Sequence, residues 1–186
     1  MPAIDKSKIL IMATNGYERS ELRVPLDELK KRGAAVTIAS FEKGPIKSWD
    51  EKDWGDSVDA DITLDDVDVN DYDALVLPGG QINPDVLRTS DAAVGIVKAF
   101  AASGRIIAAI CHGPWMLVEA GIVKGRDVTS YHSIQTDLKN AGANWHDHEV
   151  VTDNGIITSR SPKDLEAFVD KIVEEVEEGR HERRAA

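Results

Sequence analysis

The chain has 186 residues, a length that suits one domain with a well-buried core. Its hydrophobic fraction of 42% and charged fraction of 30% are ordinary for a globular protein. The net charge of -11 argues against nucleic acid or an anionic membrane as a partner, because both require a basic surface.

The first strand, the helices and the later strands can be placed in chain order from hydrophobic periodicity. Short apolar runs predict buried strands at 9–14, 35–40, 74–78, 106–110 and around Val128. Amphipathic stretches predict helices at 21–32, 91–103, 113–120, 133–141 and 162–178. An excursion with a hairpin is expected between 41 and 64, and a second hairpin at Asn154-Gly155.

This alternation is typical of an α/β fold: a three-layer sandwich with a mostly parallel central sheet and helices on both faces. We expect a single domain at 1–179, followed by a charged, frayed tail at 180–186. Residues 50–73 carry eleven acidic residues against one basic residue. The segment is interpreted as a solvated acidic surface, with a docking site for a basic partner as the alternative.

The number of cysteines and the search for targeting signals indicate the cellular compartment of the protein. The only cysteine, Cys111, excludes an internal disulfide framework and fits a reducing environment. No signal-peptide pattern is visible at the N-terminus, and the uncharged stretch at 106–118 is too short to span a bilayer. These observations predict a cytoplasmic location.

The residues around Cys111 indicate a nucleophile. Cys111 follows an apolar strand and precedes the small residues that open a helix, which is the arrangement of a nucleophile elbow. The peptide dipoles at a helix start favour the thiolate, so the position predicts a depressed thiol pKa. An inert buried cysteine is the structural alternative.

Other candidate sites are weaker. His146 and His148 would share one face of a strand, as metal ligands must, but a solvated strand start is favoured, and no metal site is predicted. No phosphate loop or dinucleotide fingerprint is present, so no nucleotide cofactor is expected.

Four motifs resemble the PfpI branch of the DJ/PfpI superfamily: Ala-Ile-Cys-His-Gly-Pro at 109–114, Leu-Pro-Gly-Gly at 77–80, and the segments at 15–22 and 125–131. The resemblance extends over about 9–176. It implies a flavodoxin-like, class I glutamine-amidotransferase-like fold. It also implies an intracellular cysteine hydrolase or stress protein that needs no cofactor.

The resemblance assigns roles to individual residues. Cys111 is the implied nucleophile, His112 its partner, and Glu18 the carboxyl that points at the sulfur. A carboxyl beside a thiolate is pushed towards its protonated form and can then donate a hydrogen bond to sulfur. From its position alone, Glu18 could equally serve the helix dipole. The amides of Gly80 and His112 are the implied oxyanion hole.

Three further positions lie close to this implied site. Tyr131 matches a tyrosine that would orient substrate. Asp85 stands where the family has a glutamate that reaches the histidine across a subunit interface, and it is shorter and one residue further along. His132 stands where a proline is usual, so a rival base is not excluded.

The predicted function is a stress-response cysteine hydrolase of protease, deglycase or glyoxalase type, acting on a peptide or small molecule. The alternative is a redox sensor or chaperone-like protein in which Cys111 is oxidised without turnover. We expect a homodimer or larger assembly, because the family places its site against a neighbouring subunit.

Overall fold

The computed structural model describes residues 3–182 and contains a seven-stranded sheet with the order β11-β12-β8-β7-β1-β3-β6. β1 (Lys8–Met12), β3 (Ala35–Ser40), β6 (Ile62–Thr63), β7 (Ala74–Leu77), β8 (Ile106–Ile110) and β12 (Ile156–Ser159) are parallel. β11 (Val150–Asp153) pairs antiparallel with β12 at the edge, through the Asn154-Gly155 hairpin. The α/β prediction is confirmed.

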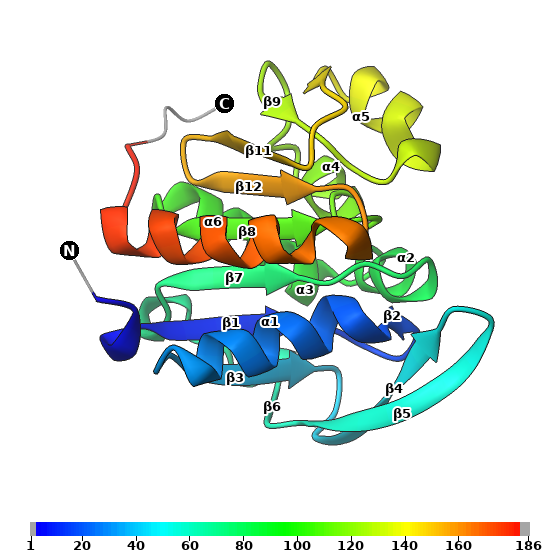
Figure 1. Cartoon of the computed structure of the whole chain (residues 1–186), viewed down its shortest axis with the longest axis vertical. Helices are drawn as coiled ribbons and strands as arrows, with labels where there is room; N and C mark the ends of the chain where they lie inside the picture. Colours follow the sequence, from blue (N-terminus) through cyan, green and yellow to red (C-terminus); the bar gives the residue numbers. More distant parts are fainter. Residues whose placement is uncertain (1–2, 183–186) are drawn as a thin grey trace.

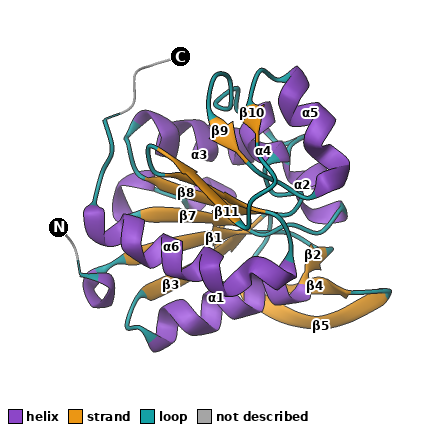
Figure 2. Cartoon of the chain, turned by 45° about the horizontal axis from the view of Figure 1, so that its top comes forward, coloured by secondary structure: helices purple, strands orange, loops and turns teal. Residues whose placement is uncertain are grey.

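Helices cover both faces of the sheet (Figures 1 and 2). On one face lie α1 (Arg19–Lys31) and α6 (Leu165–Glu178), which pack against Ile9 and Ile11 of β1. On the other lie α3 (Asp91–Ala102) and α4 (Trp115–Glu119), which pack against Leu10 and Met12. Successive strand residues therefore face opposite helical layers, as the continuous apolar runs require.

The excursion after β3 is a long hairpin of β4 (Gly44–Asp50) and β5 (Asp53–Ala60), as predicted. β2 (Tyr17–Glu18) joins it as a third, parallel strand, which fixes the loop between β1 and α1. β9 (Asp127–Val128) and β10 (Asn144–Trp145) form a separate small sheet beside α5 (Gln135–Asn140).

Two parts of the structure differ from the expected elements. α2 (Ile82–Leu87) was not predicted, because Asn83 and Pro84 interrupt its short pattern. The expected frayed tail is anchored at His181, whose amide donates to the Gly104 carbonyl at 2.9 Å; residues 183–186 of that tail lie outside the described residues. None of the helices within 3–182 has the length and hydropathy that a membrane span needs.

Candidate active site

Cys111 occupies a strained turn directly after β8. Its φ of 63° is a left-handed conformation, which a residue other than glycine adopts only when its surroundings impose it. The amide of Cys111 donates to the Ser159 carbonyl at 3.0 Å, and the amide of Gly113 to the Ile110 carbonyl at 2.8 Å. A side chain at Gly113 would overlap backbone carbonyls, so the tight turn requires glycine there. The predicted elbow is confirmed.

The sulfur of Cys111 lies among hydrogen-bond partners, although the residue is only 6% exposed. The His112 Nδ1 lies 3.2 Å from the sulfur. The backbone amides of Gly80 and His112 both act on the pKa of the sulfur in the direction of its thiolate form, so the two predicted oxyanion-hole donors lie on the sulfur side of the elbow. An oxygen developing negative charge beside the sulfur would meet both donors.

The carboxyl beside this sulfur belongs to Glu21, and the expectation that Glu18 points at the sulfur is wrong. Glu21 lies beside Cys111, since both crowd the same point next to Gly79, and its Oε2 accepts the Gly79 amide at 2.8 Å. Glu18 instead caps α1: its Oε2 accepts the Glu21 amide at 2.9 Å. The alternative role at the helix start, considered for Glu18, is the observed one.

A signal for Glu21 exists in the helical pattern. The buried residues of α1 include Glu21, Leu22, Pro25, Leu26 and Leu29, so Glu21 lies on the face that turns towards the core. A fully buried glutamate needs a specific partner, and the elbow provides one. Gly79 permits the approach, because a side chain there would overlap both Glu21 and Cys111.

The assignment of Glu18 as a cap leads to a first prediction. Glu18→Ala removes the side-chain acceptor for the Glu21 amide and should destabilise the protein by about 1 kcal/mol. The rate of Cys111 alkylation should stay within about twofold of wild type, because the Glu18 carboxylate accepts from the helix start and not from the sulfur. Urea unfolding and timed alkylation measure the two effects; unchanged stability with slowed alkylation would reverse the assignment.

Burial is the largest cause of the shifted pKa values of Glu21 and Cys111. Burial raises the pKa of the Glu21 carboxyl to about 8, and the neighbouring Glu18 carboxylate adds to the increase. Glu21 is therefore protonated at neutral pH, and a protonated carboxyl can donate to the sulfur and favour its thiolate form.

The expected depressed pKa of Cys111 is wrong. Burial raises the pKa of the thiol, the ionised form of Glu21 raises it further, and the amides of Gly80 and His112 act in the opposite direction. α4 begins only at Trp115, so its dipole is too remote to outweigh burial. A thiol in this state would have to give its proton to a neighbouring base before it could react as a nucleophile.

His112 can serve as that base. Burial lowers its pKa, and the nearby His132 lowers it further, so the ring is neutral at pH 7. Its Nε2 lies 3.2 Å from the Ser133 hydroxyl, and Tyr131 stacks on the ring at a centroid distance of 5.0 Å. The contact of Ser133 with His112 was missed by the sequence analysis, because Ser133 lies in a short 3-10 helix (His132–Ile134) 21 residues away in sequence.

The predicted acid lies apart from this pair within one chain. Asp85 is exposed on α2, and among residues 3–182 no hydrogen bond joins it to His112. His132 is exposed, and its ring packs at a tilt against the ring of Tyr131, with 4.4 Å between the ring centroids. Of the predicted site residues, the structure thus brings together Cys111, His112 and the amides of Gly80 and His112. Glu21 and Ser133, which were not predicted, lie beside them.

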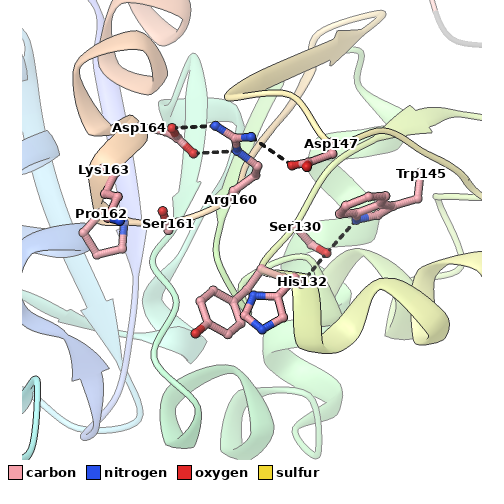
Figure 3. Close-up of a pocket in the computed structure, with 10 residues that line it drawn as sticks. Ser130, His132, Trp145, Asp147, Arg160, Ser161, Pro162, Lys163 and Asp164 are labelled. Carbon is pink, nitrogen blue, oxygen red and sulfur yellow. Dashed lines mark hydrogen bonds and ion pairs between the residues drawn. The ribbon is translucent and has the colours of Figure 1, made fainter.

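A pocket of about 600 Å³ has Tyr131 and His132 in its wall; neither Cys111 nor His112 lines it, and Tyr131, which stacks on His112, lies between the pocket and the sulfur site. Figure 3 shows Arg160 across the pocket, held by Asp164 and Asp147. The two carboxylates bind this guanidinium from opposite sides, which fixes the polar wall. The remaining lining residues are Ser130, Trp145, Ser161, Pro162 and Lys163. The pocket combines aromatic and polar groups, as small-molecule and peptide sites do.

The His146 and His148 pair is arranged differently from a metal site. His146 Nε2 lies 2.9 Å from the Asp127 carboxylate, and the two imidazole rings lie 6.2 Å apart on the exposed surface. The partner of His146 is therefore a side chain of the small sheet.

Comparisons with known proteins agree with this geometry. The profile of the DJ-1/PfpI family matches residues 7–175. The deglycase PfpI of Pyrococcus furiosus is 45% identical over 166 residues, which are 89% of this chain and 97% of that protein. YraA of Bacillus subtilis, whose name marks it as a candidate cysteine protease, is 42% identical over 161 residues, 87% of this chain and 93% of that protein. The crystal structure of DJ-1beta from Drosophila melanogaster matches with a TM-score of 0.81 and 30% identity, covering 92% of this chain and 94% of that one.

Proposed function

Because the chain belongs to the DJ-1/PfpI family, we propose that it is a stress-response cysteine hydrolase of the deglycase type, with Cys111 as nucleophile. A deglycase removes a carbonyl-derived adduct from an amine or a thiol. The observation that carries the proposal is the convergence of His112, Glu21 and the two amides on one sulfur at a strained elbow. The names of the relatives support the deglycase type over the peptidase type.

The first step is the addition of the thiol to a carbonyl carbon. As the C–S bond forms, the thiol proton passes to the neutral His112, 3.2 Å away, and the π electrons of C=O move onto oxygen. The amides of Gly80 and His112 then donate to that oxyanion. The amine or thiol leaves the adduct as its hydroxyl-bearing carbon becomes the aldehyde that the sulfur attacks, and the hydroxyl proton goes to the leaving group. The resulting hemithioacetal rearranges, by hydrogen transfer between the two adjacent carbons, to a 2-hydroxyacyl thioester. One water hydrolyses this thioester to a 2-hydroxy acid and restores the thiol, so no electrons pass to a further molecule.

A substrate screen tests this proposal. Amines and thiols carrying an α-oxoaldehyde adduct should be turned over faster than unmodified peptides, and Cys111→Ala should abolish the turnover of both. Faster cleavage of peptides would assign the peptidase type instead. Absence of any turnover, with peroxide oxidising Cys111 stoichiometrically, would favour the redox-sensor alternative.

We further propose that the active unit is a homodimer in which Asp85 reaches His112 of the second subunit. On α2, Asp85 lies beside Ile82 and Val86, which are 39% and 40% exposed. Two neighbouring aliphatic side chains with such large exposed fractions, next to a carboxylate, support a contact between chains.

Complementation between subunits tests the shared site. Asp85→Ala should lower kcat/KM by about tenfold or more, because His112 would lose a carboxylate that orients its ring. Cys111 alkylation should be largely unchanged. Mixing Asp85→Ala and Cys111→Ala protomers should restore activity, since each hybrid dimer contains one complete site. A fully active monomer in sedimentation, or mixtures without recovery, would contradict the proposal.

A further inference from the structure

A cluster of metal-ligand side chains lies at the end of α6, where the proposed reaction uses no residue. Glu175 and Glu178 are one helical turn apart, and Gly179, with a φ of 95°, ends the helix and turns the chain. His181 then returns over the turn, so that its Nε2 lies 2.9 Å from Glu175 Oε2. The ligand atoms of these three residues lie within 4.8 Å of one another.

The backbone holds His181 in this position. Its amide donates to the Gly104 carbonyl at 2.9 Å, in the turn that precedes β8. A side chain at Gly104 would overlap the His181 carbonyl, so this close approach depends on glycine. The imidazole is therefore placed by the fold and not by its contact with Glu175 alone.

The two inner ligand atoms have no hydrogen bond. Glu175 is only 6% exposed, and neither its Oε2 nor the Nε2 of His181 has a hydrogen bond among the described residues; the two buried atoms face each other at 2.9 Å, as an ion pair when the imidazole is protonated. A buried carboxylate oxygen facing an imidazole nitrogen is costly unless a proton or a cation lies between them. Glu174 and Glu177 on the same helix add further negative charge, of which Lys171 balances one through Glu174.

We propose that Glu175, Glu178 and His181 bind a Zn²⁺ ion. Zinc takes carboxylate oxygen and imidazole nitrogen, commonly with three protein ligands and a water. Two such ligands, each about 2 Å from the ion, lie about 3 Å apart, which agrees with the spacing of Glu175 and His181. Glu178 is exposed and free to complete the set from the same face of the helix.

The proposed ion has a structural role. It lies where β8 begins, whereas Cys111 follows the end of the same five-residue strand, about 16 Å away. Figure 1 shows the C-terminal end of α6 at the left, where the central strands begin, and α2 and β2 at the right, beyond the ends of those strands. Zinc would fasten His181 to the end of α6, and the amide of His181 in turn holds the turn before β8 through the Gly104 carbonyl.

Calorimetric titration of the full-length protein, free of any histidine tag, with ZnCl₂ tests the proposal. The Cys111→Ser background removes the thiol, which would otherwise compete for zinc. We expect one ion per chain and an increase in Tm that EDTA reverses. Glu175→Gln and His181→Ala should each weaken binding at least tenfold, because each loses an inner ligand.

His148→Ala is the matched control, because it removes an imidazole from the other histidine pair. This variant should bind zinc as its parent does. Absence of zinc binding, or binding that His148→Ala weakens and His181→Ala does not, would overturn the proposal. Circular dichroism of each variant without zinc shows whether it is folded. A loss of zinc affinity is then interpreted only for variants that are folded.

Discussion

Cys111→Ser and Cys111→Ala should each lower kcat/KM by at least about 10³-fold, with folding preserved. The proposed reaction forms a bond to this sulfur, and neither variant has an equivalent nucleophile: a serine hydroxyl at the same position ionises far less readily than a thiol. The amides of Gly80 and His112 would remain and would leave residual catalysis. Steady-state kinetics on the substrate identified by the screen measures this loss.

The matched control for this loss is Glu18→Gln, which changes a carboxyl close to the elbow without touching the sulfur. It should keep most of the activity. If Cys111→Ser retained more than about a tenth of wild-type kcat/KM, Cys111 would not be the nucleophile.

Glu21→Gln should change how stability depends on pH. The pKa of Glu21 is about 8 in the folded protein, whereas its ordinary value, 4.5, applies in the unfolded chain. Between these values the folded state binds more protons than the unfolded state, so the free energy of unfolding falls as pH rises. At about 1.4 kcal/mol per pH unit, wild type should lose several kcal/mol of this contribution across that range.

Glutamine does not titrate, so the variant should lack this part of the pH dependence. The stability of Glu21→Gln relative to wild type should therefore increase steadily from pH 4.5 to about 8 and then level off. Urea unfolding at a series of pH values provides the measurement, and Asp27→Asn, which removes an exposed carboxyl of the same helix, is the control. Parallel stability curves for wild type and Glu21→Gln would show that Glu21 is already ionised when folded.

Glu18 and Glu21 show which features of the structure the local sequence pattern predicts and which it does not. The sheet and the elbow at Cys111 were predictable, because apolar runs and a strand followed by small residues are features of neighbouring residues in the chain. The choice between Glu18 and Glu21 depends on where α1 begins. A shift of one helical turn exchanges a cap for a buried partner of the sulfur.

Other differences arise from tertiary contacts. The pKa of Cys111 was expected to fall because of a nearby helix start, yet packing buries the thiol beside Glu21 and raises it. Ser133 contacts His112 from a short 3-10 helix that no sequence spacing connects to the elbow. The role of Asp85 stays a prediction, because it depends on contact between two chains.

Because Cys111 is the only cysteine, its covalent modification can be compared directly with activity. Iodoacetamide is added in graded amounts, and the fraction of alkylated protein by intact mass is plotted against residual turnover. Activity should fall linearly and reach zero when every chain carries one modification at Cys111. Turnover that persists in fully alkylated protein would contradict catalysis through Cys111.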